Sequence, residues 1–195
     1  MKNITVIIDN GHGCNTRGKC SPDGSHREWE WTRKAARNLL KRLSDMGISS
    51  TLLVPEDVDI DLRTRCRRAN AIASSGEAII ISIHNNAAGD GSAWHSARGW
   101  CVFVAPNASA DSRRLACILN SEASERGLTG NRSIPPCGYL TASFAICRDT
   151  KCPAVLTENL FQDNREDVAF LANDEGIDEL VDIHYRAIIR YINEI

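Results

Sequence analysis

Short apolar runs rich in β-branched residues alternate along the chain with longer segments in which apolar residues recur every three or four positions. The runs at residues 4–8 and 78–83 are apolar at nearly every position, a pattern typical of strands buried on both faces. The first long periodic segment, residues 28–46, is closed by Gly47 and predicts an amphipathic helix. This alternation of strand and helix predicts an α/β protein with a mostly parallel sheet.

The remaining segments continue the alternation to the end of the chain. Strands are predicted at residues 4–8, 49–54, 78–83, 99–105, 144–148 and 154–157, and helices at residues 28–46, 62–76, 111–126, 165–172 and 174–192. Residues 127–143, rich in Gly, Pro and Ser, are expected to form a long loop that borders a binding cleft. Because no repeat, low-complexity tract or linker interrupts the pattern, the sequence predicts a single domain over residues 1–195.

Size and charge narrow the class of protein. With 195 residues, 43% of them hydrophobic, the chain can bury one sizeable core. Its formal net charge of −2 argues against a protein held on nucleic acid by phosphate contacts. No apolar stretch approaches the roughly 20 residues of a membrane helix, and the first strand starts directly after Asn3, without room for a signal peptide. We therefore expect no nucleic-acid partner and no membrane partner, while the oligomeric state stays open.

One group of basic residues departs from this balanced charge. Arg63, Arg65, Arg67 and Arg68 all lie in the second predicted helix, close to acidic residues. We interpret the group as a solvated face with local ion pairs.

The cysteines are numerous for a chain without an export signal. Their even number, 8, would suit disulfides in a secreted protein, but the missing signal favours reduced thiols. No Cys-x-x-Cys pair occurs, so a zinc ribbon or a thioredoxin-like site is not expected. Cys101 and Cys117 fall on apolar faces and are interpreted as core residues, whereas Cys14 and Cys20 lie in the loop after His12, where a metal contact stays a secondary interpretation.

Two histidines follow apolar strands and suggest a metal site. His12 and His84 come just after the runs at residues 4–8 and 78–83. Ligands of such sheets gather beyond the carboxyl ends of the strands, so both imidazoles are expected at the functional edge. Two histidines and one carboxylate form the ligand set of a catalytic zinc, with a fourth position for water. Residues that can supply the third ligand, or compete for the metal, are Glu28, Glu30, Glu158 and His26.

Two of these carboxylates have competing explanations. Glu28 begins the first long helix, and Ser25 with Glu28 also matches a helix capping box, in which Glu28 bonds back to the Ser25 amide. Glu158 ends an apolar strand, where a buried charge needs a partner. A carboxylate that faces a metal-bound water would have one. His184, alone on the last helix, is interpreted as a packing residue.

Several motifs in fixed order resemble one enzyme family. They are residues 9–13 (DNGHG), Glu28, residues 62–65 (LRTR) leading to residues 69–70 (AN), residues 81–87 (ISIHNNA) and residues 152–159 (CPAVLTEN). Together they resemble the zinc-dependent N-acetylmuramoyl-L-alanine amidases of the amidase 3 type over nearly the whole chain. The resemblance implies an open, twisted, mostly parallel sheet of about six strands flanked by helices on both faces, in agreement with the α/β pattern.

The resemblance also implies roles for individual residues. Zn²⁺ would be held by His12, Glu28 and His84, with Glu158 as the catalytic carboxylate. The family cleaves the amide that joins the lactyl group of N-acetylmuramic acid to L-alanine of the peptidoglycan stem peptide. Peptidoglycan is therefore the expected partner.

Two residues are expected to bind substrate. Asn86 belongs to the same motif as the second histidine. Arg148 would pair with a carboxylate of the stem peptide, with a surface ion pair as the alternative.

The chain departs from the family pattern in three places. Asn10 stands where proline is common, Asn159 where glycine is common, and residues 14–23 form an unusual loop. All the implied ligands are nevertheless present. A catalytically silent peptidoglycan-binding module and a zinc peptidase or deacetylase acting on another amide are the alternatives. Without an export signal, the chain is expected to be made in the cytoplasm and to act on the cell wall after release, like an endolysin, or after export by another route.

Overall fold

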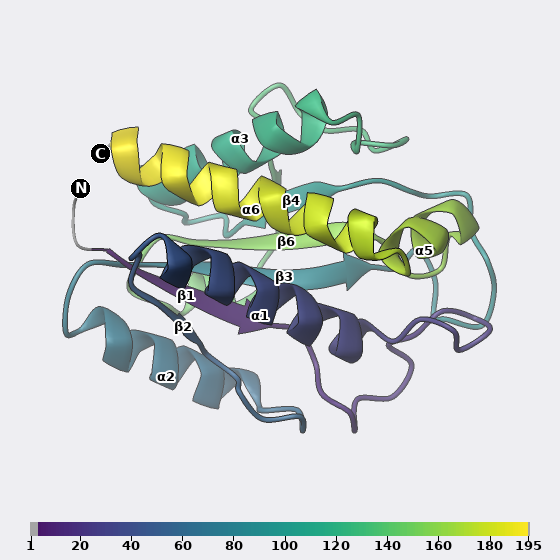
Figure 1. The fold of residues 1–195 in the computed structure, drawn as a ribbon, viewed down its shortest axis with the longest axis horizontal. Helices are drawn as coiled ribbons and strands as arrows, with labels where there is room; N and C mark the ends of the chain where they lie inside the picture. The colour runs from purple at the N-terminus through teal and green to yellow at the C-terminus, as the bar shows by residue number, and fades with distance from the viewer. Residues whose placement is uncertain (1–3, 195) are drawn as a thin grey trace.

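One six-stranded sheet, in the order β2-β1-β3-β6-β4-β5, organises residues 4–194, which the computed structural model describes (Figure 1). The strands are β1 Thr5–Asn10, β2 Ser50–Leu52, β3 Ala78–Asn86, β4 Cys101–Val104, β5 Leu140–Thr141 and β6 Ala154–Phe161. The helices are α1 Glu28–Asp45, α2 Leu62–Ala73, α3 Ala110–Glu125, α4 Ala145–Arg148, α5 Arg165–Leu171 and α6 Asp174–Glu194. No helix within the described residues is long and apolar enough to cross a membrane.

The sheet is mostly parallel, as predicted. β1 pairs in parallel with β2 and β3, and β3 pairs in parallel with β6. β4 runs antiparallel to β6, and the short β5 is parallel to β4. The carboxyl ends of β1, β3 and β6 therefore meet at one edge of the sheet, which is where ligand sites of such sheets form.

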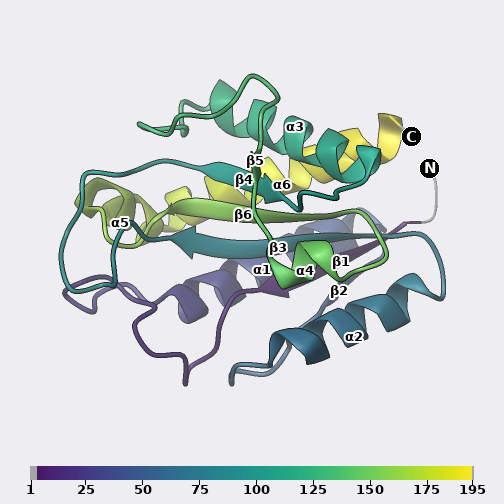
Figure 2. The same cartoon turned by 180° about the vertical axis from the view of Figure 1, so that it is seen from behind.

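Helices cover both faces of the sheet because side chains of its central strands alternate between two apolar clusters. Val6 and Ile8 pack with α1, α3 and α6 on one face, whereas Ile7 and Ile80 pack with α2 and α4 on the other. Figure 1 shows α1 and α6 across the first face, and Figure 2 shows α4 in front of the second. Complete burial of these β-branched residues holds the central strands, and with them the site at their ends, in place.

The structure corrects two predicted elements. Residues 144–148, predicted as a strand, contain the helix α4, where the Arg148 amide donates to the Phe144 carbonyl at 2.9 Å. Ile146 of α4 is buried against α2. Either a strand or a single helical turn could bury this one apolar residue, so the sequence pattern did not distinguish the two. The short strand of this region, β5, lies instead inside the predicted loop 127–143.

The strand ends also differ from the prediction. β3 continues to Asn86 and β6 to Phe161, so His84 and Glu158 lie within strands and not beyond them. The apolar pattern stops earlier because these side chains are only partly buried and line a pocket. Cys101 is buried as expected, but Cys117 is exposed, which corrects its assignment to the core.

Candidate metal centre

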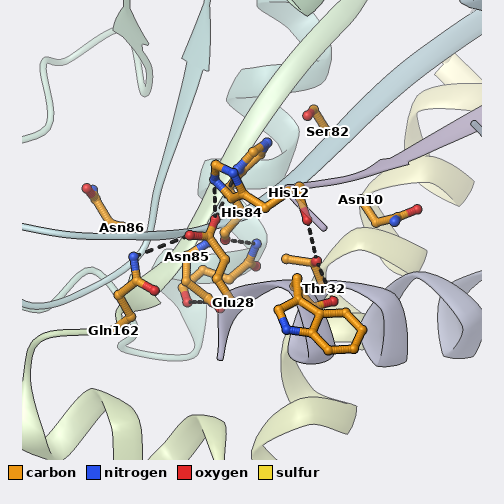
Figure 3. A network of polar contacts seen from close by, with 12 residues as sticks. Asn10, His12, Glu28, Thr32, Ser82, His84, Asn85, Asn86 and Gln162 are labelled. Atoms are coloured by element: carbon orange, nitrogen blue, oxygen red, sulfur yellow. Dashed lines mark hydrogen bonds and ion pairs between the residues drawn. The ribbon is translucent and has the colours of Figure 1, made fainter. Parts of the chain in front are cut away.

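His12, Glu28 and His84 converge at the carboxyl edge of the sheet (Figure 3). One ligand atom from each residue lies within 4.8 Å of the others. Glu28 Oε1 is 3.4 Å from His12 Nε2 and 3.0 Å from His84 Nδ1. The three side chains come from the loop after β1, the first residue of α1 and the carboxyl end of β3, so the fold itself brings them together.

His12 is held in an unusual backbone conformation. Its φ of 59° lies in the left-handed region, which costs most residues free energy unless the surroundings enforce it. Arg33 Nη2 and Arg65 Nη2 both donate to the His12 carbonyl, at 3.1 and 3.2 Å. Both arginines are buried, at 4% and 3% exposure. This double contact fixes the peptide that carries the imidazole.

Arg65 is the exception to the interpretation of the basic group as a solvated face with local ion pairs, because Arg63 and Arg67 are exposed and Arg68 pairs with Glu56. Its guanidinium lies 2.7 Å from Asp9 Oδ1 and 2.9 Å from Asp59 Oδ1, and it also donates to the Asn10 carbonyl at 2.7 Å. A buried arginine needs such partners, because an unpaired charge in the interior is costly. Arg65 therefore ties the end of β1 to α2.

Glu28 is enclosed by donors and does not cap its helix through Ser25. Its Oε1 accepts from the Asn85 amide at 3.0 Å, and its Oε2 accepts from Gln162 Nε2 at 3.3 Å. The Ser25 amide donates to Asp23 instead, at 3.1 Å, so the alternative explanation of Glu28 as part of a capping box is wrong. A fully buried carboxylate at the start of α1 also gains from the positive end of the helix dipole.

The ionised Glu28 carboxylate favours binding of a cation, and His84 binds one in its neutral form, after losing any proton that Glu28 stabilises. Burial by itself would raise the pKa of Glu28, but hydrogen bonds with His12 and His84 hold that pKa below its usual value. Burial would lower the pKa of His84, but the adjacent Glu28 carboxylate raises it. A buried carboxylate between two imidazoles is a donor set that suits a divalent ion of intermediate softness. The residues present thus fit a metal ion.

The other residues considered as ligands are not part of the group. His26 is buried, and its Nε2 lies 3.0 Å from Asn85 Oδ1. Glu30 and Cys14 are exposed, and Cys20 is partly exposed. Among residues 4–194, His12, Glu28 and His84 are the one group of three or more His, Cys, Asp or Glu side chains whose ligand atoms lie close enough to share a metal ion.

Glu158 faces the same pocket, a cavity of about 500 Å³ that the three clustered residues also line. On β6 it lies in register with His84 on β3. Its Oε2 atom is buried and has no hydrogen-bond partner within the described part of the chain. Burial, with a contribution from the negative charge of Glu28, raises the pKa of Glu158 to about 8. The carboxyl group is therefore poised to exchange a proton near neutral pH.

The two residues expected to bind substrate differ in position. Asn86 lines the pocket, and its Nδ2 lies 3.8 Å from Cys101 Sγ. Arg148 is exposed, lies outside the pocket lining and is paired with Asp149 at 2.7 Å and with Ser143 Oγ at 2.8 Å. Residues 144–146 line the pocket, whereas the loop at 127–143, expected to border it, does not contribute to the lining.

The departures from the family pattern have local explanations in part. Asn159 Nδ2 donates to the His84 carbonyl at 3.1 Å, and Asn159 Oδ1 accepts from Trp100 Nε1 at 3.0 Å, so this side chain supports β3 near the site. Asn10 is buried, and neither polar atom of its side chain has a partner among the described residues. Sequence reasoning did not identify the supporting roles of Arg33, Arg65, Asn159 and Gln162.

Comparisons with known proteins show the family of the chain. A family model described as N-acetylmuramoyl-L-alanine amidase matches residues 6–190. The chain is 28% identical over 189 residues to an endolysin of Bacillus phage SPP1, covering 96% of this chain and 66% of that protein. It is also 28% identical to the N-acetylmuramoyl-L-alanine amidase CwlM of Bacillus licheniformis, covering 97% of this chain and 69% of CwlM. The chain thus spans about two thirds of the length of these relatives.

Solved structures share the fold. The crystal structure of an N-acetylmuramoyl-L-alanine amidase from Clostridium difficile 630 superimposes with a TM-score of 0.85 at 26% identity and covers 98% of both chains. The catalytic domain of CwlV from Bacillus (Paenibacillus) polymyxa var. colistinus has a TM-score of 0.82 at 22% identity and covers 97% of this chain and 98% of that one.

Proposed function

Because this chain belongs to the N-acetylmuramoyl-L-alanine amidase family, we propose that it hydrolyses the amide between the lactyl group of N-acetylmuramic acid and L-alanine of the peptidoglycan stem peptide. The observation that carries the proposal is the convergence of two histidines and a buried glutamate beside a fourth, unpartnered carboxylate in one pocket. In this proposal residues 1–195 act as one catalytic domain, and peptidoglycan is the partner.

The proposed cofactor is Zn²⁺, with His12, Glu28 and His84 as its ligands. The donor set is the combination of two histidines and one carboxylate that catalytic zinc sites use. When bound, zinc supplies Lewis-acid polarisation of a carbonyl group and lowers the pKa of a water molecule toward 7. The surrounding contacts from Arg33, Arg65 and Gln162 keep the ligands oriented, as partners of metal ligands do elsewhere.

Glu158 is the proposed general base and acid. Its Oε2 is not engaged by any described residue, and the positive charge of a bound zinc ion would favour the ionised carboxylate, which can act as a base. It accepts a proton from the attacking water and later donates that proton to the leaving nitrogen of L-alanine. The side chains of Phe144 and Ile146 also line this pocket.

The proposed place of action is the bacterial cell wall. The support is the names of the relatives, which include an endolysin and an N-acetylmuramoyl-L-alanine amidase. The protein acts there after release from the cytoplasm, like an endolysin, or after export by another route.

The experiment compares three variants with the parent protein on purified muropeptides and intact sacculi. Glu158→Gln is expected to keep one zinc per chain and to lose at least about 100-fold in rate, because general acid–base catalysis contributes about that much or more. Glu28→Gln is expected to lose zinc and activity together. Glu30→Gln, on the exposed side of the same helix, is the matched control and keeps both.

The products distinguish the alternatives. Amidase action creates a new L-alanine amino terminus and a free lactyl carboxylate. A different new end group would indicate a peptidase or deacetylase, and binding to sacculi without any new end group would indicate a silent module. A near-normal rate for Glu158→Gln would refute its role as general base.

A further inference from the structure

The unusual loop between β1 and α1 brings a lysine to the pocket. Lys19 lines the same cavity as Glu158 and the three clustered residues. It belongs to residues 14–23, part of the loop between β1 and α1. This cation is not used by the proposed chemistry, so its position needs an explanation of its own.

The backbone of Lys19 is fastened to the start of α1. Its carbonyl accepts from the Glu28 amide at 3.0 Å. The next residue, Cys20, forms an antiparallel bridge with Arg27, and the Ser21 amide donates to the His26 carbonyl at 2.9 Å. These contacts hold the Cα atom of Lys19 at a fixed position beside the proposed metal centre, although the loop has no regular structure.

The ammonium group of Lys19 is the available positive charge of this pocket. The other cationic side chain of the lining, Arg65, is already paired with Asp9 and Asp59. Lys19 forms no ion pair with any of residues 4–194, in contrast to Lys34 and Lys41, which are paired.

The chemistry of the substrate indicates which group this cation meets. In a muropeptide the sugar side of the scissile amide is uncharged, whereas the residue that follows L-alanine is acidic and carries a carboxylate. Lysine binds carboxylates as a point charge with rotatable donors and tolerates a partly exposed position. Arg148, the residue expected from the sequence to take this role, lies outside the pocket and is paired with Asp149.

We propose that Lys19 is a specificity-determining residue that binds the free carboxylate of the stem-peptide residue next to L-alanine. The inference rests on the proposed amidase function and extends it to one class of substrate, stems whose second residue is an unamidated acid. The contact forms in the bound substrate as well as during reaction, so it acts mainly on the Michaelis constant.

The test uses two synthetic N-acetylmuramoyl tripeptides that differ only in whether this carboxylate is free or amidated, both with an amidated C-terminus. With zinc-loaded parent protein, kcat/KM is expected to be about tenfold higher for the free acid, the size of one charged hydrogen bond. Lys19→Met is expected to abolish this preference by raising KM for the free acid alone. Lys19→Arg is expected to restore part of it, and Lys34→Met, an exposed and already paired lysine, is the matched control that leaves it unchanged.

The outcomes separate this inference from the proposed function. If the parent protein cleaves neither compound at the lactyl amide, the amidase proposal itself fails. If it cleaves both and Lys19→Met keeps the preference, the inference is wrong. If Lys19→Met slows both compounds equally and shifts the pH profile, Lys19 acts on Glu158 and not on the substrate, which also overturns the inference.

Discussion

Acid is expected to destabilise the fold through one buried histidine on α6. His184 is 2% exposed; its Nδ1 lies 2.7 Å from the Leu180 carbonyl, and its Nε2 lies 2.9 Å from Thr157 Oγ1. Because the carbonyl can only accept, Nδ1 carries the proton of the neutral ring. Burial lowers the pKa of His184 from 6.5 to about 4, while the hydrogen bond to Leu180 opposes this shift.

The sign and size of the effect follow from linkage. Below pH 6.5 the unfolded chain binds a proton at this position and the folded protein does not, so stability is complete above that pH and falls as the pH drops toward 4. A difference of about 2.5 pKa units corresponds to roughly 3 kcal/mol in total, of which about 2 kcal/mol is lost by pH 5. Since domains are stabilised by only about 5–15 kcal/mol, the loss is measurable.

The assay is urea unfolding of metal-free protein at several pH values between 7.5 and 5, followed by tryptophan fluorescence, for the parent and His184→Gln. Other titrating groups contribute equally to both proteins, so the difference between their free energies of unfolding isolates His184. This difference is expected to shrink by about 2 kcal/mol between pH 7.5 and 5. A difference that stays constant over this range would refute the reasoning.

Three further predictions concern the metal centre. Arg33→Met is expected to weaken zinc binding about 10- to 100-fold in a chelator competition, because it removes one of the two donors to the backbone carbonyl of His12. Arg37→Met, at an exposed position, is the control and is expected to bind zinc like the parent. Equal affinities of Arg33→Met and the parent would contradict the positioning role of Arg33. Gly11→Ala is expected to weaken zinc binding as well, because the added Cβ would lie 2.5 Å from the His84 ring and push the ring away. Gly76→Ala, whose added Cβ meets nothing within 4 Å, is the control. An unchanged zinc affinity of Gly11→Ala would show that the His84 ring can move without loss of binding. Zinc at 100 times its dissociation constant is expected to stabilise the parent by about 2.7 kcal/mol in thermal unfolding, and an unchanged melting temperature would argue against a site in the folded state.

The fold was predictable because its strands are buried on both faces. Continuous apolar runs such as residues 78–83 indicate parallel central strands without ambiguity, and the helical stripes follow with errors of a few residues at their ends. The short elements were not predictable. One turn of helix around Ile146 and a two-residue strand at Leu140–Thr141 depend on the tertiary contacts that each segment finds and not on local periodicity.

The candidate ligands and the catalytic carboxylate could be predicted from the sequence, whereas the residues that hold them in position could be predicted less well. A histidine or glutamate at the end of an apolar run is visible in the sequence, as for His84 and Glu158. The buried Arg65 carried a signal that was not used: it lies one helical turn before Ala69 on the inward side of α2. Lys19 carried no such signal, because an irregular loop has no periodicity from which the direction of a side chain can be inferred.

The most direct test of the central claim is a titration of zinc into chelator-treated protein, with release of L-alanine amino termini from purified muropeptide measured at each step. If His12, Glu28 and His84 together hold the ion that activity requires, hydrolysis rises in proportion to added zinc and stops rising at one ion per chain, and Glu28→Ala shows no rise at stoichiometric zinc. Full activity of the zinc-free parent protein, or the same titration curve for Glu28→Ala, would contradict the account.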